Sequence, residues 1–138
     1  GDVPSIAGVY VQPNAVQGES RTHGFFYRAV DANSGFIGLP ILGRQPDGKP
    51  MAAVQFLHAK ALALAPAGAL EARGLLRTDD GCRASCVDWY GNARPIFLGS
   101  RVFALMGYEL VEGRYDGTVV RERRRVDFTP ATAAPVSN

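Results

Sequence analysis

The sequence predicts an all-β domain, and three observations point to it. Sixteen glycines and nine prolines separate short apolar runs, a pattern typical of strands joined by turns. The runs are rich in β-branched and aromatic residues, which are common in strands. One stretch also occurs twice, since FLHAKALAL from Phe56 resembles FLGSRVFAL from Phe97. We therefore expect a single β domain over residues 1–128, built from repeated antiparallel sheets, and a flexible tail over residues 129–138.

The first strands are expected from alternation and aromatic content. Residues 7–13 alternate Val and Tyr, residues 23–30 are rich in aromatics, and residues 35–42 are apolar although Gly and Pro interrupt them. Turns are expected at residues 31–35 and at residues 45–48, where Pro, Asp and Gly follow one another. Proline presets φ in such a turn and glycine accepts a positive φ.

The segment over residues 51–65 has two interpretations. Its residues Val54, Leu57, Ala61 and Leu64 recur at the spacing of a helical stripe. Its likeness to the segment from Phe97, which carries a Gly-Ser turn, favours a strand instead.

The last strands are expected over residues 101–113 and 118–128, with a turn at residues 115–117. Two further turns are indicated by glycines at residues 79–81 and 90–92.

The repeat relates residues near 50–78 to residues near 91–128, at an offset of 41. A period of roughly 40 to 50 residues with several strands per unit is typical of propeller blades, which stack to cover their apolar faces. The alternatives are a chance likeness, or two sheets packed as a small β-sandwich or β-barrel.

The stretch SCVDWYGNARPIFLGSRVFALMGYELVEG, followed by RERRRVDFTP, resembles the closing part of secreted bacterial β-propeller proteins. The resemblance is strongest over residues 85–130, and its motifs are structural. It implies blade-like sheets and an exported protein. A propeller needs at least about four blades and this chain has length for about three, so the resemblance implies a fragment, a ring of copies or a small relative.

Two cysteines, Cys82 and Cys86, are expected to form a disulfide across a turn if the protein is exported. Free core thiols are the main alternative. A redox pair or a zinc site is disfavoured because the spacing is not C-x-x-C and no ligand set surrounds the pair. The two histidines, His23 and His58, are expected to be structural or at the surface.

Two groups of residues are candidates for ligand binding. Trp89 and Tyr90 would stack on a sugar, or else pack on the sheet. Arg121, Arg123 and Arg125 would share one face of a strand and attract a polyanion, or else serve as a charged edge.

The sequence lacks the motifs of common catalytic sites. It contains no Gly-x-Ser-x-Gly, Walker or dinucleotide fingerprint. The DANSG stretch resembles half of a calcium loop but lacks the closing glutamate. We expect no catalytic residue, no metal and no cofactor.

The net charge of +2 and the sequence pI of about 8.7 are only weak evidence for a polyanion partner. The sequence contains no run of about 20 apolar residues that could span a membrane. The chain opens GDVPSIAG without the pattern of a signal peptide, so an exported location, secreted or periplasmic, assumes a leader removed ahead of Gly1.

We expect a non-catalytic binding or scaffolding domain of the bacterial cell envelope, in a homo-oligomer or a larger β assembly. Its ligand would be an envelope glycan or another polyanion. The alternatives are a small secreted hydrolase using Asp79, Asp80 and Asp88, and a polyanion-binding module built on the arginine-rich strand.

Overall fold

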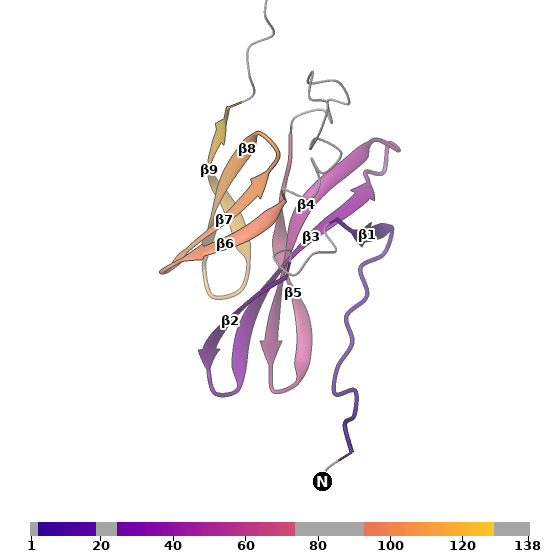
Figure 1. Ribbon diagram of the computed structural model, residues 1–138, viewed down its shortest axis with the longest axis vertical. Helices are drawn as coiled ribbons and strands as arrows, with labels where there is room; N and C mark the ends of the chain where they lie inside the picture. The colour runs from indigo at the N-terminus through magenta and orange to yellow at the C-terminus, as the bar shows by residue number, and fades with distance from the viewer. Residues whose placement is uncertain (1–2, 19–24, 74–92, 129–138) are drawn as a thin grey trace, which may run out of the picture.

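The computed structural model describes residues 3–18, 25–73 and 93–128 (Figure 1). These residues form strands and turns without a helix, which confirms the all-β prediction. In chain order the strands are β1 (Ala15–Gln17), β2 (Phe26–Asp31), β3 (Ser34–Arg44), β4 (Pro50–Lys60), β5 (Ala63–Glu71), β6 (Arg94–Leu98), β7 (Arg101–Met106), β8 (Glu109–Tyr115) and β9 (Val120–Asp127).

The strands form two antiparallel sheets, and each sheet uses one contiguous part of the chain. The first sheet has the order β1-β3-β4-β5, and β2 also pairs with β3. Because β4 occupies one edge of β3, β1 and β2 lie end to end along its other edge, opposite residues 41–43 and 34–38 respectively. The second sheet is an up-and-down meander in the order β6-β7-β8-β9.

The two sheets pack face to face around a shared core (Figure 1). Phe36 of β3 and Phe56 of β4 stack with their ring centroids 5.4 Å apart, and Phe97 of β6 meets them edge-on at 5.7 and 6.3 Å. The arrangement agrees with the sandwich alternative. The buried core consists of Phe36, Val54, Phe56, Ala67, Leu70, Ala93, Val102, Ala104, Met106, Val111 and Val120.

Arg28 of β2, in the first sheet, contacts residues of the second sheet. Its guanidinium lies 5.1 Å from the ring centroid of Phe97 and 5.9 Å from that of Phe36. It also donates a hydrogen bond to the carbonyl of Gly99, in the turn between β6 and β7, at 2.6 Å. A charged side chain thus covers the edge of the aromatic core through cation–π contacts.

Residues 51–65 are strands with a turn between them, so the helical alternative is wrong. The turn falls at Ala61 and Leu62, whose φ angles are 47° and 68°. Residues 7–13, expected as a strand, pair with no other strand of the described chain, and the first strand begins only at Ala15. Residues 129–138, expected as a tail, lie outside the described residues.

The turns of the two similar segments do not lie at equivalent positions of the 41-residue repeat. Phe56 precedes its turn by five residues, whereas Phe97 precedes the turn at Gly99 and Ser100 by two. The two phenylalanines therefore lie at different distances from their turns, although both face the same core. Each sheet contains an up-and-down run of strands, as a blade would, but the two turns do not follow the offset.

No helix among the described residues has the length and apolar character needed to cross a membrane.

Candidate functional site: an arginine-rich sheet face

The two faces of the second sheet differ because successive side chains along a strand point to opposite faces. On β8, Val111 is buried, and a Cβ on Gly113 would lie 3.0 Å from the Leu70 side chain, so these residues face the core. The intervening residues Leu110, Glu112 and Arg114 consequently face away from the first sheet.

A β-bulge in β9 decides which of its arginines share that outer face. Glu112 lies opposite Arg124, but the next residue, Gly113, lies opposite Glu122. Arg123 is therefore the extra residue of the bulge, which shifts the alternation of β9 by one position.

The bulge separates the three arginines that the sequence placed on one face. Arg121 lies opposite Arg114, on the outer face, and Arg123 reaches the outward Glu112. Arg125 lies opposite the buried Val111 and faces inward. The expectation of one shared face is wrong for Arg125, because simple alternation does not hold across a bulge.

Arginines from the other strands complete the outer face. Arg101 of β7 alternates with the buried Val102, and Arg94 of β6 alternates with the buried Ala93 and Pro95. We call this surface the arginine face. Its basic residues are Arg94, Arg101, Arg114, Arg121, Arg123 and Arg124, and the apolar residues among them are Ile96, Phe103, Leu105, Leu110 and Val126.

Glu112 is the carboxylate in the middle of the arginine face. Arg101 Nε donates to its Oε1 at 2.9 Å, and Arg123 lies 3.7 Å from the same oxygen. The hydrogen bond from Arg101 is the main cause that lowers the pKa of Glu112, and it raises the pKa of Arg101. One glutamate thus holds two arginines in place.

The remaining arginines of this face meet less negative charge. Arg121 lies 3.6 Å from Asp116 in the turn before β9. The Nε atom of Arg94 is buried and has no hydrogen-bond partner within the described part of the chain. Among the described residues, six guanidinium groups therefore face one glutamate on the sheet and one aspartate at its border, so this part of the face is positively charged at neutral pH.

Arg125 has a structural environment instead. Its side chain is only 13% exposed and forms ion pairs with Glu109 and Glu122. It also donates to the backbone carbonyl of Glu71 at 2.7 Å, while Arg73 pairs with Glu122 at 3.1 Å. This cluster joins β9 to the end of β5. The Arg125 guanidinium already donates its hydrogen bonds within the protein, so it is not a candidate for ligand binding.

A second polar cluster lies between the sheets near His58. Tyr115 Oη lies 2.7 Å from His58 Nε2 and donates to the Gly117 carbonyl at 2.5 Å, and His58 Nε2 lies 3.1 Å from the Thr118 carbonyl. Burial raises the pKa of Tyr115. These groups line a half-open cavity of about 500 Å³. The side chains of His58 and Tyr115 bond to each other and to backbone carbonyl groups, so His58 has the structural role expected from the sequence.

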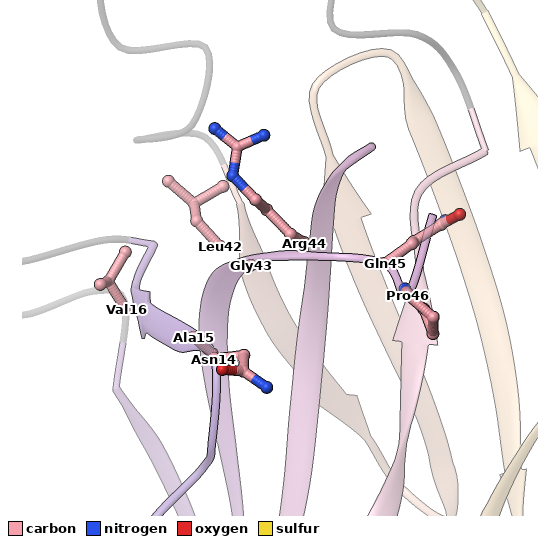
Figure 2. A pocket seen from close by; sticks show the side chains of 8 residues that line it. All are labelled: Asn14, Ala15, Val16, Leu42, Gly43, Arg44, Gln45 and Pro46. Atoms are coloured by element: carbon pink, nitrogen blue, oxygen red, sulfur yellow. The ribbon is translucent and has the colours of Figure 1, made fainter. Parts of the chain in front are cut away.

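A surface hollow of about 820 Å³ lies where β1 meets the end of β3 (Figure 2). Figure 2 shows Leu42, Arg44, Gln45 and Val16 around it. Arg44 donates to the carbonyl of Gly48 at 2.9 Å. Among the described residues that line this hollow, Arg44 is the one charged side chain, so the hollow lacks the convergent polar anchors of a specific site.

The other candidates lie outside the described residues. These are Cys82 and Cys86 of the expected disulfide, the aromatic pair Trp89 and Tyr90, the acids Asp79, Asp80 and Asp88 of the hydrolase alternative, and His23. In the described ranges, no three His, Cys, Asp or Glu side chains gather closely enough to hold a metal ion.

Comparison with known proteins gives no relative. No protein-family model, no curated protein and no solved structure matches the chain.

Proposed function

We propose that the protein is a non-catalytic binding module that holds an acidic polysaccharide of the bacterial envelope against the arginine face. The observation that carries this proposal is the ratio of six arginines to one glutamate on one side of a single sheet. The resemblance to secreted bacterial β-propeller proteins is the reason to propose an exported location, secreted or periplasmic.

The geometry of the face favours a polymer over a small ligand. Neighbouring strands lie about 4.8 Å apart, and successive residues on one face of a strand lie about 6.8 Å apart. The guanidinium groups are thus spread over an open lattice without a cavity, which suits anionic groups that repeat along a chain. Each guanidinium can form two parallel hydrogen bonds to a carboxylate or sulfate.

The residues between the arginines favour a glycan over a nucleic acid. Ile96, Leu105 and Leu110 offer aliphatic surface to the C–H faces of sugar rings. Binding of single-stranded nucleic acid relies on bases that stack on aromatic side chains. Phe103 is the aromatic residue of this face, and the Arg101 guanidinium covers it at 4.7 Å from the ring centroid.

The test replaces three arginines other than Arg101 and Arg123, the two that form ion pairs with Glu112. The variant Arg114→Gln/Arg121→Gln/Arg124→Gln should bind heparin, used as a model sulfated glycan, about tenfold or more weakly than the parent, because it loses contacts to sulfate groups. Each lost contact should also reduce the salt dependence of binding. Titration calorimetry at several salt concentrations measures both the affinity and the slope.

The matched control is Arg44→Gln/Lys49→Gln/Lys60→Gln, which removes the same charge from exposed positions of the first sheet. It should leave the affinity within about twofold of the parent, because charges beyond a Debye length of about 10 Å are screened. An equal loss in both variants would show that net charge alone drives binding, and would contradict the proposal. If a single-stranded oligonucleotide bound more tightly than heparin or alginate, the ligand of the arginine face would be a nucleic acid and the proposed glycan ligand would be wrong.

A further inference from the structure

The segment over residues 3–13, which we call the N-terminal arm, is extended and exposes apolar side chains. Figure 1 shows it running beside the body of the molecule up to β1. Val3, Ile6, Val9 and Val11 are each between 70% and 88% exposed. An uncharged, apolar stretch of this kind is unusual at a solvent-facing surface and is typical of a segment that binds a partner.

The arm has the sequence of a strand. Val9, Tyr10 and Val11 are strong strand formers and point alternately to two sides in an extended chain. Pro4 and Pro13 bracket residues 5–12, all of which have a backbone N–H. Since proline cannot donate to a ladder, this interval of eight residues is the length over which the arm can pair.

The arm does not reach the β2 edge of its own first sheet. Gly8 passes so close to the β4–β5 turn that a Cβ there would lie 2.4 Å from the Leu62 carbonyl oxygen. In the order β2-β3-β4-β5 this turn is separated from β2 by β3. The path of the arm therefore leads away from β2.

The strand β2 offers an edge that fits the arm. Its six residues pair with β3 on one side, and no described strand pairs with the other side. Phe25, Tyr27 and Val30 lie along or beside it and are 53% to 63% exposed. Opposed apolar side chains on neighbouring strands stabilise a sheet, so valines of an added strand would complement this edge. Strands β5, β6 and β9 also pair on one side only, but they expose fewer large apolar side chains: none on β5, Leu98 on β6 and Val126 on β9.

We propose that the N-terminal arm of one copy of this chain adds as a strand to β2 of a second copy and so extends the first sheet. Backbone hydrogen bonds along the added strand supply affinity and the apolar side chains supply register. Each copy carries both an arm and an acceptor edge. Pairing is reciprocal in a dimer or sequential in a longer assembly. This proposal does not depend on the arginine face.

The test uses two complementary variants of the full chain. Val9→Asp/Val11→Asp disables the arm and leaves β2 intact, whereas Tyr27→Asp/Val30→Asp disables the edge and leaves the arm intact. By light scattering coupled to gel filtration, the parent should have at least twice the chain mass of 14.8 kDa, and each variant alone should have the monomer mass. An equimolar mixture should form a one-to-one pair, because one intact arm meets one intact edge.

Val126→Asp, which changes an exposed valine of β9, is the matched control and should keep the parent's mass. Circular dichroism shows whether each variant keeps its strands, and Val30→Asp alone replaces the double variant if Tyr27→Asp unfolds the protein. A monomeric parent at about millimolar concentration overturns the proposal, as does a parent-like mass of the arm variant. A mixture of folded variants that stays monomeric overturns it as well.

Discussion

At the scale of single residues, the turn between β4 and β5 shows backbone strain. Ala61 and Leu62 both have a positive φ, which costs about 1–2 kcal/mol for a residue with a side chain. Two-residue hairpin turns of this kind favour Asn followed by Gly. The strands on either side are long and well paired, so they hold the turn in a conformation that its own residues disfavour.

Replacing the pair by Ala61→Asn/Leu62→Gly should raise the free energy of unfolding by about 1–2 kcal/mol, because the new residues accept a positive φ. Leu62 is 75% exposed, so little packing is lost. Urea unfolding followed by circular dichroism measures the gain. Ala32→Asn, in the β2–β3 turn where no positive φ occurs, should give no comparable gain. A double variant no more stable than this control would show that the turn is not strained.

Glu122 links stability to pH at the same scale. The hydrogen bond from Arg125 is the main cause that lowers the pKa of Glu122 below its ordinary value of 4.5. A carboxyl group whose folded pKa is depressed stabilises the fold above its unfolded pKa, and this contribution is lost as the pH falls through the lower, folded pKa.

We therefore expect Glu122→Gln to be less stable than the parent at neutral pH and to approach it as the pH falls below 4.5 and through the lowered pKa of Glu122, where the parent carboxyl becomes protonated. Urea midpoints at several pH values measure the gap between the two proteins. A gap that stays constant with pH would mean that the ionised carboxylate contributes nothing through Arg125.

At the scale of elements, the bulge in β9 explains both a success and an error of the sequence prediction. The run from Arg121 to Arg125 was recognised as a strand with exposed charge, because its composition shows this directly. Which arginines share a face depends on pairing with β8, and one unpaired residue, Arg123, reverses the alternation. Local sequence does not specify a bulge of this kind, since it arises from the register of two strands.

The contact between sheets depends on Gly38 of β3. A Cβ at this position would lie 2.5 Å from Cβ of Pro95 on β6 and 3.4 Å from the Phe56 ring. Pro95 is rigid and fully buried, so it cannot move aside as a flexible chain would.

Gly38→Ala should therefore lower the free energy of unfolding by about 1–3 kcal/mol through overpacking of the core. Gly35→Ala, on the same strand, would meet the end of the exposed Tyr27 side chain, which can rotate away, and should cost less. Thermal or urea unfolding of both variants makes the comparison. Equal losses would mean that the fit of Gly38 against Pro95 is not what limits this position.

At the scale of the whole molecule, the sequence predicts fold class better than arrangement. Turn residues and β-branched runs identify strands because both act locally, as at residues 45–48 and at the β6–β7 turn of Gly99 and Ser100. Residues 101–113, expected as one strand, are instead β7 and β8 joined by a turn at Gly107 and Tyr108. The strand expected at residues 7–13 pairs with no described strand, because pairing depends on the path of the chain relative to an open edge as well as on the local pattern. The packing of the two sheets rests on contacts such as Phe36 with Phe97, whose sequence separation leaves no local signal.

The candidate site shows the same limit. The arginines of β9 are adjacent in sequence and could be recognised, whereas Arg94, Arg101 and Arg114 join them only through strand register. Neither RVFALM nor ELVEGRY alternates regularly between polar and apolar residues, so the sequence does not show which face its arginine occupies. Burial of the alternate residues in each strand identifies that face, and this burial depends on the packing of the two sheets.

The use of one contiguous chain segment for each sheet has a kinetic consequence. Apart from β1, every strand pairs with its sequence neighbour, so the hairpins close over short loops at a small entropic cost. The long-distance step is the docking of two preformed meanders, in which Phe36 and Phe56 meet Phe97. The rate of folding should therefore depend more on substitutions at these rings than on substitutions within either hairpin series.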